Sequence, residues 1–179
     1  MKKILLVGNP NVGKSVMFSR LSGARVVVSN YPGTTVDYTK SRMRVEGKEY
    51  EIVDLPGTFS LEPKDKAEEV ACKMLEEAKP HTAAVIDVID ATAVERGLYL
   101  TLELIERGYP VVVALNMSDA ARDRKIKIDV EKLERILGVP VVETIATTGA
   151  GLKERVSKIG KAKPTDIEAV KRRLRREKK

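Results

Sequence analysis

Several residue types are scarce in this sequence of 179 residues, and each scarcity excludes a class of structure. There is no tryptophan and there are only two phenylalanines, so the hydrophobic core must be largely aliphatic. The single cysteine, Cys72, excludes an internal disulfide and fits a reducing compartment. No apolar run approaches the roughly 18 residues that a membrane-spanning helix needs. No cluster of cysteine, histidine and carboxylate side chains has the spacing of a transition-metal site. We therefore expect a chain that is soluble as given and holds no transition metal.

Negative charge is scarce near the C-terminus. From Lys153 onward, 12 lysines and arginines face 4 acidic residues, a balance of +8, so residues 1–152 carry −1 of the net +7. The basic character therefore belongs to the tail and not to the body of the domain. A body without excess positive charge is not expected to bind nucleic acid through its phosphates.

Apolar runs alternate with segments of helical periodicity along most of the chain, which is the pattern of βαβ units on a largely parallel sheet. The residues Glu46-Gly47-Lys48 separate two short strands and indicate one antiparallel hairpin. We predict an α/β fold with helices on both faces of a mostly parallel six-stranded sheet. The expected strands are Ile4–Val7, Arg42–Val45, Tyr50–Val53, Ala83–Ile89, Val111–Leu115 and Val139–Val142. The expected helices are Ser15–Leu21, Lys64–Lys79, Thr92–Arg107, Val130–Leu137 and Leu152–Ile159. The domain should span residues 1–160, followed by a basic helical tail at 161–179.

The segment from Gly8 to Ser15 matches the phosphate-binding pattern G-x-x-x-x-G-K-[ST]. It follows a predicted buried strand and opens a predicted helix, which is the context that this motif requires. Its glycines let backbone N–H groups curl around phosphate oxygens at the positive end of the helix. We expect Lys14 to bridge the β- and γ-phosphates and the Ser15 hydroxyl to ligate Mg²⁺. The predicted nucleotide contacts here are Asn9, Pro10, Asn11, Val12, Gly13, Lys14, Ser15 and Val16.

The four residues from Asn116 to Asp119 stand after a buried strand, where N-K-x-D motifs read guanine. The Asp119 carboxylate can accept hydrogen bonds from both donors on the N1 and N2 edge of guanine. Adenine has no such donors, so it would leave a desolvated carboxylate unpaired. Met117 replaces the usual lysine, so an apolar side chain remains at this position but the ammonium group is absent. An N-glycosylation sequon at Asn116-Met117-Ser118 and plain loop polarity are the alternative interpretations.

Three further loops complete the predicted nucleotide site. Asp54-Leu55-Pro56-Gly57 fits D-x-x-G, in which Asp54 holds Mg²⁺ through water and the Gly57 N–H contacts the γ-phosphate. Gly33-Thr34-Thr35 lies where a switch threonine would bind Mg²⁺, with Thr35 preferred to Thr34. Ala146, Thr147 and Thr148 follow the last strand. From this position in the chain we expect a backbone N–H, preferably that of Ala146, to donate to guanine O6.

These motifs, in this order and spacing, resemble the cytosolic G domain of FeoB, the prokaryotic ferrous iron transporter family. The resemblance covers roughly residues 1–160. It rests on Gly-Asn-Pro-Asn in the P-loop, on Asn-Met-x-Asp, on Asp-Leu-Pro-Gly and on the stretch 100–104. It implies a P-loop, Ras-like G domain that hydrolyses GTP with Mg²⁺ at the cytoplasmic face of the cell membrane. It also implies a following helical domain, whose start would be the tail, and a membrane-embedded permease domain as partner. Thr147-Thr148 and Asn30-Tyr31 depart from the commoner family pattern.

Catalysis cannot use a glutamine of this chain, because the sequence contains none and Thr58 follows D-x-x-G. The FeoB resemblance implies that Asn11 ligates K⁺ beside the phosphates, where a cation would neutralise charge developing in the transition state. The alternative is that Asn11 only satisfies hydrogen bonds of a turn. The predicted catalytic set is Lys14, Asn11, Thr35 and Gly57.

Two other functions are compatible with these motifs. One is a stand-alone assembly GTPase whose basic tail binds ribosomal or transfer RNA. The other is a non-catalytic nucleotide sensor whose amphipathic tail binds a membrane or a partner helix. Deletion of residues 164–179 would separate them from a transporter domain, for which a homo-oligomer is also conceivable.

Overall fold

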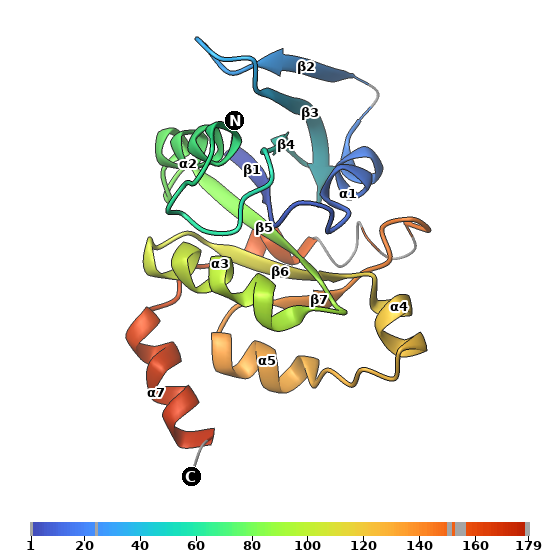
Figure 1. The fold of residues 1–179 in the computed structure, drawn as a ribbon, viewed down its shortest axis with the longest axis vertical. Helices are drawn as coiled ribbons and strands as arrows, with labels where there is room; N and C mark the ends of the chain where they lie inside the picture. Colours follow the sequence, from blue (N-terminus) through green and yellow to red (C-terminus); the bar gives the residue numbers. More distant parts are fainter. Residues whose placement is uncertain (1, 24, 150–151, 153–156, 178–179) are drawn as a thin grey trace.

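The computed structural model describes residues 2–23, 25–149, 152 and 157–177. Seven strands form one sheet in the order β2-β3-β4-β1-β5-β6-β7 (Figure 1). The strands are β1 (Lys2–Val7), β2 (Val26–Asn30), β3 (Asp37–Val45), β4 (Lys48–Asp54), β5 (Ala83–Asp90), β6 (Val111–Asn116) and β7 (Val141–Glu143). The helices are α1 (Lys14–Leu21), α2 (Lys66–Ala78), α3 (Val94–Glu106), α4 (Ser118–Asp123), α5 (Val130–Leu137) and α7 (Ile167–Glu177), with a 3₁₀ helix at Ser157–Lys161.

The centre of the sheet is parallel, as predicted. Strand β1 pairs in parallel with β4 and β5, and β6 pairs in parallel with β5 and β7. All six residues of β6 are buried, which explains why its sequence is a continuous apolar run without alternation. Because parallel strands end at the same edge, the loops after β1, β5 and β6 gather there and can share one site.

The predicted number of six strands is wrong, because the structure has a seventh strand, β2. It pairs antiparallel with β3, beside the antiparallel β3–β4 hairpin that Glu46 and Gly47 close. The side chains of Val26, Val27 and Val28 are 48%, 47% and 64% exposed. A three-valine run at the sheet edge shows neither alternation nor burial on one face, so its sequence did not separate it from a loop.

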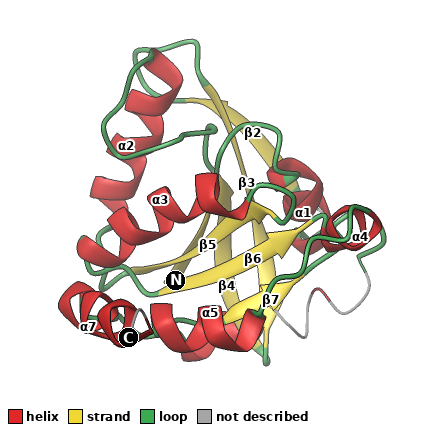
Figure 2. Ribbon diagram, turned by 60° about the horizontal axis from the view of Figure 1, so that its bottom comes forward, coloured by secondary structure: helices red, strands yellow, loops and turns green. Residues whose placement is uncertain are grey.

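Helices cover both faces of the sheet, as predicted (Figure 2). Strand residues Leu5, Val53 and Val85 pack in one cluster with residues of α2 and α3, including Leu75 and Leu104. The opposite-face residues of the same strands pack with α1 in a second cluster, which contains Ile4, Leu6, Ile52, Met17 and Phe18. The core is therefore aliphatic on both faces, in keeping with the scarcity of aromatic residues.

The helix ends follow from local chemistry. Helix α5 has the predicted bounds, since Asp129 accepts a hydrogen bond from the Lys132 N–H at 2.9 Å and Gly138 ends it with φ +68°. Helix α4 was not predicted, because its six residues are too few for a periodic pattern. The predicted helix at Leu152–Ile159 falls largely outside the described residues, and its described end belongs to the 3₁₀ helix.

The tail forms α7, which lies against α5 at one end of the molecule (Figure 1). Val170 is fully buried within the first core cluster. Arg173 donates to the Ile136 carbonyl at 2.9 Å and Thr165 donates to the Gly138 carbonyl at 2.7 Å. The division at residue 160 stays a prediction, but the tail contacts the body of the domain. Among the described residues, no helix has the length and apolar character needed to span a membrane.

Candidate nucleotide-binding site

The predicted phosphate loop joins β1 to α1 and depends on two glycines. Gly8 has φ +151°, and a Cβ there would lie 2.4 Å from the Val88 carbonyl oxygen. Gly13 has φ +85°, and a Cβ there would lie 2.3 Å from the Asn116 Nδ2. Both positions therefore require glycine on conformational and steric grounds. The loop is pressed against the ends of β5 and β6, so its shape is fixed by the sheet.

Asp54 contacts the Lys14 ammonium, which is predicted to bind phosphate, and the Ser15 hydroxyl, which is predicted to ligate Mg²⁺. Its two carboxylate oxygens accept hydrogen bonds from the Lys14 ammonium and from the Ser15 hydroxyl, each at 2.9 Å. The Lys14 and Asp54 side chains are only 10% and 8% exposed. The three groups line a cleft of about 430 Å³ together with Gly57. A serine hydroxyl beside a carboxylate is an oxygen donor set of the kind that Mg²⁺ prefers, so these residues fit that ion.

The cleft also contains residues that the sequence reasoning missed. Asp37 and Thr39 of β3 line it, and Thr39 stands directly opposite Asp54 in the β3–β4 register. Only the pairing of β3 with β4 brings them to the phosphate loop. No local motif could have indicated this contact, because it joins strands through long-range pairing.

Asn116 connects the phosphate loop to the two base-binding segments. Its Nδ2 donates to the Val12 carbonyl at 2.9 Å, and its Oδ1 accepts from the Ala146 N–H at 2.9 Å. The side chain is 3% exposed. A buried amide that uses both ends in this way holds three loops together. The structure thus brings the P-loop, the N-M-S-D segment and the Ala146–Thr148 loop to one place.

The guanine motif turns sharply after Asn116. Met117 adopts φ +60° and precedes α4, whose second residue, Asp119, is exposed. Ser118 donates from its hydroxyl to the Thr144 carbonyl at 3.1 Å, which fastens the turn to the last strand. This geometry leaves the Asp119 carboxylate at the surface and able to receive a ligand.

The expectation that the Ala146 N–H donates to guanine O6 stays a prediction, and it requires this N–H to exchange its present partner for the base. That N–H is already bonded to Asn116, which the sequence could not reveal. The Thr148 N–H is bonded to the Ile145 carbonyl at 3.2 Å. Of the three residues, Thr147 is the one whose N–H has no protein acceptor among the described residues, so it is a second candidate donor to guanine O6.

The predicted switch threonine does not line the cleft that contains Ser15 and Asp54. Thr34 closes a turn by donating to the Tyr31 carbonyl at 2.9 Å, while Thr35 is exposed and is not among the described residues that line the cleft. The loop is instead attached to α2, where Tyr31 donates to the Glu77 carboxylate at 2.5 Å. The hydrogen bond to this carboxylate raises the pKa of Tyr31. The role of Thr35 stays a prediction that requires this loop to move.

The segment after Gly57 is held by acidic side chains from two helices. Glu68 of α2, which is 4% exposed, accepts from the Phe59 N–H at 3.0 Å and the Lys64 N–H at 2.8 Å. Glu103 of α3 accepts from the Leu61 N–H at 2.8 Å. These glutamates were missed, because exposed and buried glutamates look alike in a helical sequence.

The predicted potassium ligand, Asn11, lies at the exposed tip of the phosphate loop with φ +66°. Asparagine tolerates this left-handed conformation better than most residues. Its neighbour Asn9 is 7% exposed, and the Asn9 Oδ1 is buried without a hydrogen-bond partner. The Asn11 side chain is therefore exposed to solvent, and its role toward K⁺ stays a prediction.

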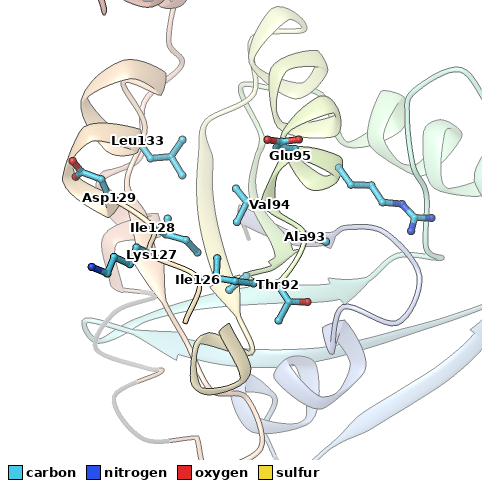
Figure 3. Close-up of a pocket in the computed structure, with 11 residues that line it drawn as sticks. Thr92, Ala93, Val94, Glu95, Ile126, Lys127, Ile128, Asp129 and Leu133 are labelled. Atoms are coloured by element: carbon cyan, nitrogen blue, oxygen red, sulfur yellow. The ribbon is translucent and has the colours of Figure 1, made fainter. Parts of the chain in front are cut away.

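A cavity of about 600 Å³ lies between the start of α3 and the α4–α5 loop (Figure 3). Its walls are largely apolar, with Val94 facing Ile126, Ile128 and Leu133. It contains none of the predicted site residues. Within the described part of the chain, no group of three or more His, Cys, Asp or Glu side chains could hold a metal ion by itself.

Comparison with known proteins identifies the family. The sequence matches the family described as Ferrous iron transport protein B over residues 2–159. The Fe(2+) transporter FeoB of Salmonella typhimurium is 41% identical over 159 residues, which are 86% of this chain and 20% of that protein. The chain thus spans about a fifth of the length of this relative.

Two solved structures are similar throughout the domain. The cytosolic domain of L. pneumophila FeoB is 40% identical with a TM-score of 0.83, and the match covers 90% of this chain and 69% of that one. The cytosolic domain of the T. maritima FeoB iron transporter in its GMPPNP form is 38% identical with a TM-score of 0.83, covering 90% and 63%. The matches do not favour a stand-alone RNA-associated GTPase. The chain belongs to the FeoB family, and it is the N-terminal G domain of that family.

Proposed function

We propose that this chain binds GTP with Mg²⁺ and hydrolyses it to GDP and phosphate, as the regulatory domain of a ferrous iron transporter. The observation that carries the proposal is the Asn116 side chain, which bonds the Val12 carbonyl and the Ala146 N–H, each at 2.9 Å. It fixes a phosphate-binding loop at a set position beside a guanine-reading segment. The T. maritima relative, whose structure is a GMPPNP form, supports a guanosine triphosphate as ligand.

Base selection rests on Asp119. Its exposed carboxylate accepts the N1 and N2 hydrogens of guanine, and the Met117 side chain lies beside the base. The Ala146 N–H donates to O6 in place of its present bond to Asn116, and the Thr147 N–H is the alternative donor. Adenine offers an acceptor where guanine offers the N1 donor, so ATP would leave the carboxylate desolvated and unpaired.

Phosphate binding exchanges partners of Lys14. The ammonium, 2.9 Å from Asp54 in this structure, donates instead to oxygens of the β- and γ-phosphates. Backbone N–H groups of the phosphate loop surround the β-phosphate, and the Gly57 N–H donates to the γ-phosphate. A side chain at Gly57 would be crowded, because a Cβ would lie 3.0 Å from the Pro10 ring. We expect triphosphate binding to move the Gly57 segment relative to the phosphate loop.

Two cations complete the site. Mg²⁺ would be held by the Ser15 hydroxyl, by Asp54 through water and by Thr35 after its loop closes, and it supplies charge neutralisation for the β- and γ-phosphates. K⁺ would be held by the Asn11 carbonyl oxygen, and it supplies positive charge where an arginine finger acts in other GTPases. No glutamine can orient water, so backbone groups near Thr35 and Gly57 carry that role.

The transporter context comes from the relatives. FeoB of Salmonella typhimurium is named as a Fe(2+) transporter, and this chain matches 20% of it. We infer that the domain acts at the cytoplasmic face of the cell membrane and that its partner is the permease domain of the same transporter. Nucleotide-dependent movement of the Tyr31–Val36 loop and of the segment after Gly57 would report the GTP state to that partner. A homo-oligomer of the domain is compatible with this role.

Steady-state GTP hydrolysis tests the proposal. Turnover is measured with Mg²⁺ in potassium chloride and in sodium chloride at equal ionic strength. Two variants distinguish the side chain of Asn11 from its backbone: Asn11→Ala removes the carbonyl oxygen and strains the φ of +66°, whereas Asn11→Gly removes it without strain. We expect faster turnover in potassium for the natural chain, and no potassium effect in either variant.

Equal rates in the two salts would refute the potassium role and leave Asn11 as a turn residue. Loss of potassium stimulation in Asn11→Ala but not in Asn11→Gly would assign the effect to backbone strain. Absence of GTP turnover in any salt would contradict the proposed catalysis and favour a nucleotide sensor.

A further inference from the structure

A second, smaller cavity lies between the phosphate loop, the segment after Gly57 and the start of α3. Its volume is about 250 Å³, and its lining includes Asn9, Asn11, Phe59, Asp90, Arg96 and Gly97. It therefore borders two of the loops that the proposed GTP cycle moves. Gly97 allows α3 to pack closely against β5, because a Cβ there would lie 2.5 Å from a side-chain carbon of Ile89.

One residue that lines this cavity, Asn9, has a buried polar atom without a partner, and another, Arg96, has an exposed side chain. The Asn9 Oδ1 is buried and accepts no hydrogen bond. The Arg96 guanidinium makes no hydrogen bond or ion pair among the described residues, although it carries five N–H donors. It lies instead over the Phe59 ring, 4.6 Å from the ring centroid. A buried acceptor without a donor and a guanidinium without a protein acceptor thus belong to residues that line the same cavity.

The Arg96 position over Phe59 ties α3 to the segment that follows Gly57. Phe59 is 38% exposed, so the core covers it only in part. The Arg96 guanidinium lies over one face of its ring. Asp90 stands in the same cavity, with one carboxylate oxygen accepting from the Thr92 N–H at 2.7 Å and the Thr92 hydroxyl at 2.8 Å. Its negative charge favours a cation inside the cavity.

We propose that Arg96 is a positioning residue with two alternative partners, the Phe59 ring and the Asn9 Oδ1. The inference rests on the proposed GTP cycle. When the Gly57 N–H engages the γ-phosphate, Phe59 is drawn away from Arg96, and the guanidinium enters the cavity and donates to Asn9. That hydrogen bond stabilises the Asn9–Asn11 part of the phosphate loop in the triphosphate state. Arg96 itself touches neither nucleotide nor metal.

Arginine is suited to this exchange for physical reasons. A planar guanidinium can stack on an aromatic ring and can also donate directed hydrogen bonds, whereas a lysine ammonium stacks less well and is more strongly hydrated. A lysine at this position should therefore keep part of the effect. Alanine should remove both arrangements.

The movement can be followed without hydrolysis, because the chain has no tryptophan. Phe59→Trp introduces a single fluorophore under the Arg96 guanidinium. We expect its emission to differ between the GDP and GMPPNP complexes, and the difference to disappear when Arg96→Ala is combined with it. An emission that is the same in both complexes, although both nucleotides bind, would overturn the proposal.

Kinetics test the consequence for catalysis. We expect Arg96→Ala to lower kcat about tenfold while the affinity for a fluorescent GDP analogue changes by less than about twofold. Arg96→Lys should restore part of kcat, and Arg124→Ala, an exposed arginine on another face, should have none of these effects. In a double-mutant cycle, Asn9→Ala should add little to Arg96→Ala.

Three results would overturn the inference: natural kcat in Arg96→Ala, equal loss of kcat and nucleotide affinity, or fully additive effects of the Asn9 and Arg96 substitutions. If the natural chain does not turn over GTP, the proposed catalysis fails, and the Phe59→Trp emission alone decides the two-partner arrangement of Arg96.

Discussion

Asp87 lies in the middle of β5 with 1% of its surface exposed, and it should make the stability of the domain depend on pH. Its carboxylate accepts one hydrogen bond, from the Thr101 hydroxyl at 2.5 Å. Burial raises the pKa of Asp87 from 3.8 to about 7, and the Thr101 hydrogen bond offsets only part of this rise. The folded protein therefore holds a proton on Asp87 that the unfolded chain has already released at pH 5.

The sign and size of the effect follow from proton linkage. Between pH 4 and pH 7 the folded state binds one more proton than the unfolded state, so the free energy of unfolding falls as pH rises. The fall is about 1.4 kcal/mol per pH unit, or about 3 kcal/mol between pH 5 and pH 8. Asp87→Asn removes this titration and keeps an oxygen that can accept the Thr101 hydrogen bond. We expect the variant to be more stable than the natural chain at pH 8. At pH 5 this difference in the free energy of unfolding should be smaller by about 3 kcal/mol.

Urea unfolding at several pH values measures this difference. Far-ultraviolet circular dichroism is the suitable signal, because the chain has no tryptophan. The control is Asp123→Asn, which changes an exposed aspartate and should run parallel to the natural chain at every pH. Parallel profiles for Asp87→Asn and the natural chain would refute the argument, since they would mean that Asp87 has the same pKa in the folded and unfolded states.

Two further substitutions test packing that the structure reveals. Val170→Ala should lower the free energy of unfolding by about 2 kcal/mol, because Val170 is fully buried in the main core, whereas Leu174→Ala, at 39% exposed, should cost under about 1 kcal/mol; equal effects in urea unfolding would mean that α7 is not packed on the domain. Glu68→Ala leaves two backbone N–H groups without their acceptor. It should lower the free energy of unfolding by about 3 kcal/mol and expose the 58–64 segment to limited proteolysis. Glu69→Ala breaks only surface ion pairs and should have neither effect.

The sequence was sufficient wherever function is encoded in consecutive residues. The P-loop from Gly8 to Ser15 and the segment from Asn116 to Asp119 could be predicted because each contains its own turn geometry and its own chemical groups. The buried strands could be predicted for a similar reason, since β6 is one unbroken apolar run. The family resemblance extended this to the whole G-domain order.

What the sequence could not show depends on long-range pairing. Strand β2 is stabilised by pairing with β3 at the sheet edge, and its exposed valines have no periodic pattern. The Ala146 N–H donates to Asn116, 30 residues away, a contact that no local pattern indicates. The Arg96–Phe59 contact and the buried Glu68 similarly join distant segments. The position of Thr35 depends on a loop that the ligand must rearrange, and neither the sequence nor the structure tests that role.

The most direct test of the central claim is nucleotide selection by Asp119. Hydrolysis of GTP and of XTP, in which a carbonyl oxygen replaces the guanine amino group, is measured for the natural chain, for Asp119→Asn and for the exposed control Asp123→Asn. The account predicts turnover of GTP but not XTP by the natural chain and the control, and the reverse preference in Asp119→Asn, whose amide can donate to the xanthine oxygen. An unchanged preference for GTP in Asp119→Asn would contradict the claim that this segment reads guanine.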